Sequence, residues 1–185
     1  MVPASSAVAL PFELVPFPGD PVPAGLRLHG QIRRQGDSLE LLYRLIGPWR
    51  ELRIPAAAPT PERRDGLWQS TCLECFLAHP GDRAYWELNV CPSGHWNSYR
   101  LPAYRGELGL ENGFSAPQLQ LLPGDDQLEA RIRLALPPEA AAAVRLEVAV
   151  TAVLETLAGA VSHWALAHPG TAADFHRRDT FLLRV

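Results

Sequence analysis

Residues 67–104 carry most of the side chains that could bind a ligand or react with one. This segment holds three of the five tryptophans, all three cysteines and three of the four tyrosines, with two glutamates set among them. Aromatic rings can cover the apolar faces of sugars, and carboxylates accept hydrogen bonds from hydroxyl groups. We therefore expect function to centre on this segment.

The two glutamates can share one face of a β-sheet. Alternate side chains of a strand point to the same side, so a strand that ends before the turn at 79–83 presents Glu74 on one face. The strand after the turn presents Tyr85, Glu87 and Asn89 together. If these strands pair through the turn, Glu74 and Glu87 lie on the same side of the sheet.

Three interpretations of this acidic pair stay open. Glu74 and Glu87 can accept hydrogen bonds from a bound sugar without catalysing a reaction. They can act as general acid and base on a glycoside, where their separation would set the stereochemical outcome. They can also be structural groups that form ion pairs with Arg83, Arg100 or Arg105.

The turn at 91–97 contains proline and glycine and is expected to reverse the chain before another strand. Asn97 adds an amide to the polar group. Trp96 and Tyr99 fall on opposite faces of the outgoing strand, so one ring is expected in the core and the other at a ligand. The sequence leaves open which ring does which.

The spacing Cys72-x-x-Cys75 is not interpreted as a metal or redox motif. Residues three apart in a strand face opposite sides, and no second C-x-x-C accompanies them. We expect buried free thiols, with Cys91 as a third.

A second polar cluster lies near the end of the chain and contains His163, His168, Asp174 and His176. Such residues can ligate a metal. Polar loop residues more often bond the backbone, and for Asp174 we favour a bond to its own loop. No metal site is predicted.

Alternating hydrophobic and polar residues predict half-buried strands over 26–32, 127–136 and 144–150. Further strands are predicted over 39–46, 51–54, 71–77, 84–90, 95–101, 118–122 and 180–185. The one helix expected is a turn or two over 138–143, where prolines precede alanines. Many short strands favour an all-β, antiparallel two-sheet β-sandwich of jelly-roll type. The length suits a single domain, 1–185, with disorder expected only at the ends, chiefly in residues 1–10.

Charge and composition exclude several classes of function. The chain has a formal charge of −3 and contains no lysine, which gives no broad attraction for nucleic acid or anionic membranes. It has no export signal and no apolar stretch long enough to span a membrane, so we expect a cytoplasmic protein. Phosphate-binding glycine loops and a G-x-S-x-G elbow are absent as well.

Three groups of residues carry a resemblance to a known family. They are Leu67-Trp68-Gln69-x-Thr71-Cys72-x-Glu74-x-Phe76; Tyr85-Trp86-Glu87-x-Asn89-x-x-Pro92-x-Gly94-x-Trp96-Asn97-x-Tyr99 with Tyr104-Arg105; and Ser162-x-Trp164-Ala165-Leu166-x-His168 followed by Asp174-Phe175-His176. In these segments the chain resembles the DOMON-like group related to family 9 carbohydrate-binding modules.

The resemblance implies a DOMON-like β-sandwich whose relatives bind sugars or haem, some with calcium near their loops. The sugar-binding relatives clamp a ring between two tryptophans, and Trp68, Trp96 and Trp164 could take such roles by their position in the motifs. The haem-binding relatives use Met and His as axial ligands. Because the only methionine here is Met1, that ligation is not expected, and no cofactor is predicted.

The leading hypothesis is a non-catalytic domain that binds a small polar ligand, most plausibly a saccharide or a sugar-containing metabolite. A glycoside-acting enzyme that uses Glu74 and Glu87 and a protein-interaction domain are the alternatives. The predicted ligand-binding residues are Trp68, Glu74, Tyr85, Glu87, Asn89, Trp96, Asn97, Tyr99, His163, Trp164 and His176.

Overall fold

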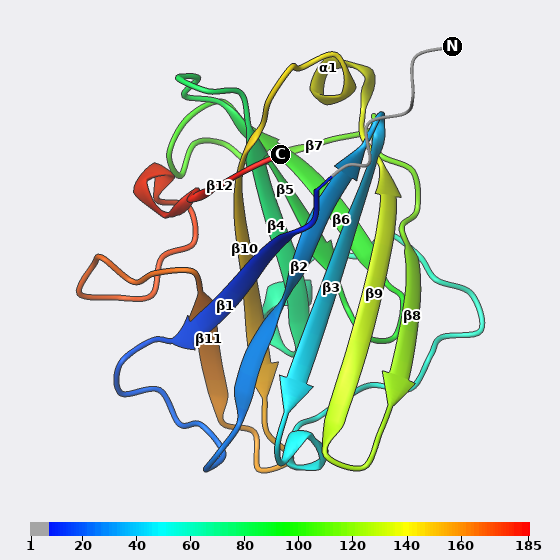
Figure 1. Ribbon diagram of the computed structural model, residues 1–185, viewed down its shortest axis with the longest axis vertical. Helices are drawn as coiled ribbons and strands as arrows, with labels where there is room; N and C mark the ends of the chain where they lie inside the picture. The colour runs from blue at the N-terminus through cyan, green and yellow to red at the C-terminus, as the bar shows by residue number, and fades with distance from the viewer. Residues whose placement is uncertain (1–7) are drawn as a thin grey trace.

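The computed structural model describes residues 8–185, and their strands form one antiparallel sheet (Figure 1). The strands are β1 (Leu10–Pro16), β2 (Arg27–Gln35), β3 (Ser38–Ile46), β4 (Cys72–Ala78), β5 (Tyr85–Val90), β6 (Trp96–Leu101), β7 (Gly109–Leu110), β8 (Gln118–Pro123), β9 (Gln127–Ala135), β10 (Glu147–Glu155), β11 (Val161–Ala165) and β12 (Leu183–Arg184), with the helix α1 (Pro138–Ala141) between β9 and β10. The all-β class with one short helix is confirmed. For residues 1–7, the expected disorder lies outside the described residues.

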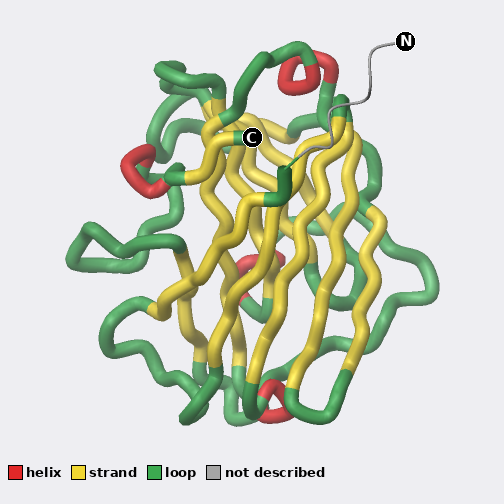
Figure 2. Tube along the Cα trace, viewed as in Figure 1, coloured by secondary structure: helices red, strands yellow, loops and turns green. Residues whose placement is uncertain are grey.

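The strand order is β7-β6-β5-β4-β10-β11-β1-β2-β3-β9-β8, and β12 pairs with β10. β1 connects the two halves of this sheet, because residues 10–14 pair with β2 whereas Val15 and Pro16 pair with β11. The two sheets expected from the sequence are thus joined into one that curls. Figure 2 shows its halves as a front and a back layer of strands.

The main hydrophobic core lies between the two halves. In β3 every second side chain is buried, among them Leu41, Tyr43 and Leu45. They pack in one cluster with buried residues of β4, β5 and β10. The Tyr43 hydroxyl donates a hydrogen bond of 2.8 Å to the backbone oxygen of Glu74. The two layers are therefore joined by a polar contact as well as by apolar packing.

β4 and β5 are buried on both faces, unlike the half-buried strands of the other layer. Their outer face carries a second, smaller cluster that includes Phe76, Tyr85 and Phe181. Two segments cover it: a short 3₁₀ turn, Leu67–Gln69, which contacts both strands, and the chain between β11 and β12. A sheet face covered by loops provides walls for a pocket.

Some predicted elements differ from the observed ones. Residues 51–54 are not a strand, because a 3₁₀ turn, Trp49–Glu51, is followed only by an isolated bridge at Leu52. β1 and β11 were not predicted. Pro11 and Pro16 lie within β1, near its start and at its end, without breaking it, because each part of the strand pairs on one side only. In residues 8–185 no helix has the length and apolar character needed to cross a membrane.

Candidate ligand-binding site

A pocket of about 300 Å³ opens on the outer face of β4 and β5. Its walls come from five parts of the chain: the 3₁₀ turn before β4, strands β4 and β5, the loop after β6, strands β10 and β11, and the loop before β12. The lining residues are Trp68, Glu74, Phe76, Glu87, Arg105, Leu108, Val153, His163, Ala173, Asp174, Phe175 and His176. Five of the eleven predicted site residues meet here, and we take the pocket as the candidate site: Trp68, Glu74, Glu87, His163 and His176.

Glu74 and Glu87 form the polar part of the pocket floor. In the β4–β5 pairing Glu74 lies opposite Asn89, and Glu87 lies opposite Phe76, which places both carboxyl groups on the outer face. The prediction that they share a face is correct. Their exposed fractions are 2% and 5%, so each carboxyl group is almost fully withdrawn from water yet borders the pocket.

Each carboxyl group uses only one of its two oxygens within the protein. Glu74 Oε2 accepts a hydrogen bond of 3.3 Å from the Thr151 hydroxyl, and Glu87 Oε1 accepts one of 2.8 Å from Asn89 Nδ2. Glu74 Oε1, Glu87 Oε2 and Asn89 Oδ1 are buried without a protein partner in the described chain. Buried acceptors of this kind are rare and call for an explanation.

Burial also changes the protonation of the pair. Burial, with a further contribution from the charge of Glu87, raises the pKa of Glu74 to about 8. Burial likewise raises the pKa of Glu87, against the hydrogen bond from Asn89. Between residues 8 and 185 neither carboxylate forms a salt bridge. Arg100 pairs with Glu139 and Arg105 with Asp174, so the structural ion pairs considered for Glu74 and Glu87 do not form.

Trp68 forms an aromatic part of the rim. Its side chain is 38% exposed, and its ring meets Tyr99 edge-on with 5.9 Å between ring centres. Asp65 anchors the same turn to the sheet, because its Oδ1 accepts hydrogen bonds of 2.9 Å from Asn97 Nδ2 and 2.8 Å from the Tyr99 hydroxyl. Asn97 and Tyr99 therefore position the rim and do not line the pocket.

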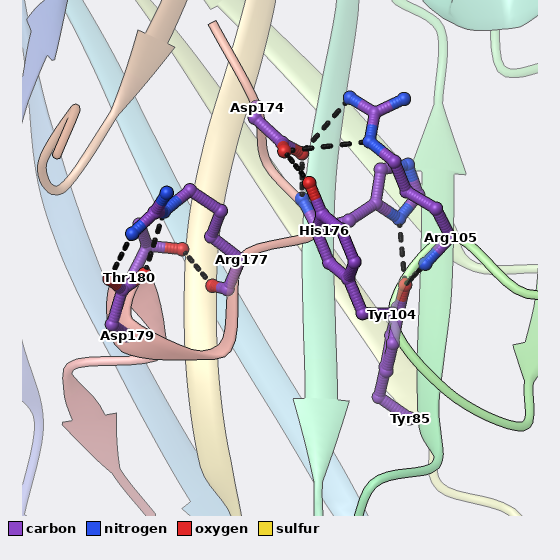
Figure 3. Close-up of polar contacts among 8 residues, drawn as sticks. All are labelled: Tyr85, Tyr104, Arg105, Asp174, His176, Arg177, Asp179 and Thr180. Atoms are coloured by element: carbon purple, nitrogen blue, oxygen red, sulfur yellow. Dashed lines mark hydrogen bonds and ion pairs between the residues drawn. The ribbon is translucent and has the colours of Figure 1, made fainter. Parts of the chain in front are cut away.

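The loop before β12 supplies the other aromatic wall through Phe175, and a polar network holds this loop in place (Figure 3). Asp174 Oδ1 accepts a 3.1 Å bond from the backbone N–H of His176, which confirms the predicted bond of Asp174 to its own loop. Asp174 also forms a 3.1 Å ion pair with Arg105. Burial opposes ionisation, but the bonds from Tyr104 and Arg105 outweigh it and lower the pKa of Asp174.

The two pocket histidines are each held by one partner. His176 Nδ1 lies 2.9 Å from the Tyr85 hydroxyl, and burial lowers the pKa of His176, with Arg105 adding to the effect. His163 Nδ1 lies 3.0 Å from Asp20. Tyr85 is thus a support beneath the loop. Among the described residues no three His, Cys, Asp or Glu side chains are grouped as metal ligands.

Two tryptophans predicted to contact a ligand do not reach the pocket. Trp96 and Trp164 are 5% and 2% exposed and belong to the main core cluster. Trp96 lies beside Val90 on the core-facing side of the sheet, whereas Tyr99 takes the outer face. The prediction of a ligand platform at Trp96 or Trp164 is wrong, because alternation separates two faces without saying which one packs against the core.

Asn89 belongs to the pocket floor only indirectly, since it holds Glu87 and is itself fully buried. The three cysteines are free as expected. Cys72 and Cys75 are buried, whereas Cys91, which was expected to be buried as well, is only partly buried. Sequence reasoning missed Phe175, Arg105, Asp65 and the partner of His163. Phe175 and Arg105 belong to the sequence motifs that carry the family resemblance, and this resemblance is the feature of the sequence that could have indicated them as site residues.

Comparison with solved structures identifies the class of fold. A protein of Bacteroides uniformis, whose description as carbohydrate-binding is itself provisional, superposes with a TM-score of 0.64 at 14% identity, covering 94% of this chain and 84% of that one. At this identity the likeness concerns the fold, and it agrees with the fold implied by the resemblance to carbohydrate-binding modules. No protein-family model and no curated protein sequence matches the chain.

Two further structures are family 9 carbohydrate-binding modules from Caldicellulosiruptor kristjanssonii. One is in complex with cellotriose, with a TM-score of 0.45 and 16% identity over 78% of this chain and 67% of that chain. The other is in complex with glucose, with a TM-score of 0.40 and 18% identity over 78% of this chain and 69% of that chain. None of the three structures is described as DOMON-like.

Proposed function

We propose that the protein binds a saccharide, without catalysing a reaction on it, in the pocket above β4 and β5. The observation that carries the proposal is the pair of buried, unpartnered oxygens Glu74 Oε1 and Glu87 Oε2 on the floor of a pocket with an aromatic rim. A buried polar atom without a partner costs about 1–3 kcal/mol. Ligand hydroxyl groups that hydrogen-bond with these oxygens would recover that cost.

The aromatic side chains of the pocket fit the other character of a sugar, its apolar ring faces. Trp68 and Phe175 line the pocket from two separate loops, and Phe76 contributes from the floor. Aromatic rings bind apolar surfaces well and lose little entropy on doing so. The volume of about 300 Å³ lies at the lower end of small-ligand sites, which range over roughly 300–1,000 Å³. A pocket of this volume can enclose a monosaccharide or a disaccharide, but it is too small to enclose a longer saccharide.

The protonation of Glu74 and Glu87 argues for binding rather than hydrolysis. A glycosidase needs one protonated and one ionised carboxyl group, and its site keeps their pKa values apart. Here burial raises the pKa of both groups, and no cation holds either in the ionised form in residues 8–185. Both groups can thus hydrogen-bond with the hydroxyl groups of a sugar. The carbohydrate-binding description of the Bacteroides uniformis protein with the same fold supports this function.

The test is calorimetric titration of the protein with glucose, galactose, mannose, xylose, cellobiose and maltose. Trp68→Ala should abolish the binding that any of these sugars shows. Trp49→Ala is the matched control, because Trp49 also lies in a three-residue 3₁₀ turn but outside the pocket. Trp49→Ala should retain binding. The proposal fails if none of the sugars binds, or if Trp68→Ala binds them as tightly as Trp49→Ala does.

A further inference from the structure

We propose that the preferred ligand of this pocket is an amino sugar, a saccharide that carries a primary ammonium group, and that this group binds between Glu74 and Glu87. The inference rests on the proposed saccharide function and names the class of sugar. It follows from three features of the pocket: the hydrogen-bond acceptors on its floor, the two carboxyl groups that lack a counter-charge, and the ion pair that Arg105 forms with Asp174.

The floor offers acceptors that lack donors. Glu74 Oε1 and Glu87 Oε2 are acceptor atoms on one sheet face, and neither has a partner in the described chain. A hydroxyl group brings one donor together with lone pairs that themselves need donors. An ammonium group brings three donors and no acceptor. Among the groups that sugars carry, the ammonium group matches this floor most fully.

The charge of the pocket points the same way. Glu74 and Glu87 are 2% and 5% exposed and have no salt bridge in residues 8–185. A buried carboxylate without a counter-charge is strongly unfavourable, and a ligand cation supplies that counter-charge. Bonds between an ammonium group and a carboxylate are roughly twice as strong as neutral ones.

The other charged and titratable groups near the pair do not supply the missing cation. Those that line the pocket are Arg105, His163, Asp174 and His176. Those that lie near the pair without lining the pocket are Tyr43, Cys72, Tyr85 and Tyr99. Within residues 8–185, Arg105 is the only arginine that lines the pocket, and it is paired with Asp174 at 3.1 Å. The same pairing leaves no unpaired cation for an acidic sugar, so a uronate should bind poorly.

A divalent metal ion fits less well. Calcium takes six to eight oxygen ligands, and the described residues contain no group of three His, Cys, Asp or Glu side chains able to hold a metal. The two carboxyl groups can instead satisfy an ammonium group on a ligand whose remaining surface packs against Trp68 and Phe175.

The experiment compares sugars that differ at one position. Affinities are measured by calorimetry at pH 7 for glucose and glucosamine, galactose and galactosamine, and mannose and mannosamine, with glucuronate as the acidic probe. We expect the amino sugar of at least one pair to bind at least about tenfold more tightly than its partner, a difference that a charge-assisted bond readily supplies. Glucuronate should not bind measurably.

Proton release gives an independent readout. Because the pKa of Glu74 is raised to about 8, this group holds its proton at pH 7 in the free protein and must lose it to face an ammonium group. Titration of glucosamine in two buffers of different ionisation enthalpy should therefore reveal a net release of protons on binding. A neutral sugar should release none.

Variants assign the effect to the acidic pair. In Glu74→Gln and in Glu87→Gln the ratio of amino-sugar to neutral-sugar affinity should fall towards one, and proton release should be smaller in Glu74→Gln than in the natural protein. Glu129→Gln is the control, because Glu129 is also a buried strand glutamate but lies in the other half of the sheet on β9. It should keep the ratio. Using both pocket variants guards against one of them failing to fold.

The outcomes separate this inference from the proposed function. If neutral sugars bind and no amino sugar binds more tightly, the ammonium site is refuted and saccharide binding stands. If the preference persists in both pocket variants, the ammonium group binds elsewhere and the inference is again refuted. If no sugar of either kind binds, both proposals are refuted.

Discussion

Replacing Glu74 by glutamine should make the protein more stable at neutral pH, even though it alters the binding site. Burial raises the pKa of Glu74 from 4.5 to about 8 on folding. Above pH 4.5 the unfolded chain releases this proton while the folded chain keeps it, so stability falls as the pH rises through this range. The loss is about 1.4 kcal/mol per pH unit between the two pKa values, which amounts to about 3 kcal/mol at pH 7.

Glutamine has nearly the shape of the protonated acid and carries no charge at any pH. Its side-chain oxygen can still accept the bond from the Thr151 hydroxyl. Near pH 4.5 the variant and the natural protein should therefore unfold at nearly the same urea concentration. Their difference should grow with pH and level off above pH 8. Urea titrations followed by tryptophan fluorescence at pH 4.5, 6, 7 and 8 measure it directly.

Glu129→Gln is a control in which the change in stability at pH 7 should have the opposite sign. Burial opposes ionisation at Glu129, but its bonds and ion pairs with Arg131 and Arg44 outweigh this and lower its pKa. Its stabilising contribution is present above its ordinary pKa and is lost as the pH falls, so this variant should be less stable than the natural protein at pH 7. If Glu74→Gln shows no gain at pH 7 and the natural protein is equally stable at pH 5 and pH 7, Glu74 is not desolvated as described.

Three further predictions concern the scaffold of the site. Gly30→Ala should lower the free energy of unfolding, measured by urea titration, by about 3 kcal/mol, because a Cβ there would lie 1.8 Å from the backbone oxygen of Leu42. Unchanged stability would show that β2 and β3 move apart easily at this point. Tyr85→Phe should lower the free energy of unfolding by about 1 kcal/mol, because it removes the hydrogen bond to His176. An unchanged free energy of unfolding would mean that this bond does not hold the loop. Asp65→Ala removes the acceptor that anchors the Trp68 turn, and should weaken saccharide binding about tenfold in calorimetry while lowering the melting temperature only slightly; retained affinity would contradict the anchoring role.

Much of the fold was accessible from the sequence because strand alternation is a local signal. The register of β4 against β5 follows from a short hairpin, so the shared face of Glu74 and Glu87 could be predicted from residues that lie close together in the chain. β1 was missed because its prolines look like turn residues. Whether β1 can contain these prolines depends on which strand pairs with each of its edges, and this pairing is a property of the assembled sheet.

The site was predicted less completely for a similar reason. Alternation places Trp96 and Tyr99 on opposite faces, but only the packing of the two layers decides which face is the core. The bond between His163 and Asp20 joins residues 143 positions apart. Phe175 and Arg105 come to the pocket from loops whose courses depend on the polar network around Asp174. Local patterns carry no information on such contacts.

The crossing of β1 from one half of the sheet to the other also affects the order in which the chain can fold. Val15 pairs with Ala165, so this closure must wait until Ala165 has left the ribosome. Contacts between such distant residues slow folding, because a long loop must close before they are gained. Until then β1 and β10 each keep an unpaired edge, the kind of edge that promotes aggregation. The pocket, whose walls include His163 and Phe175, is thus among the last parts of residues 8–185 to form, and a nascent chain cannot hold a ligand there before Phe175 has left the ribosome.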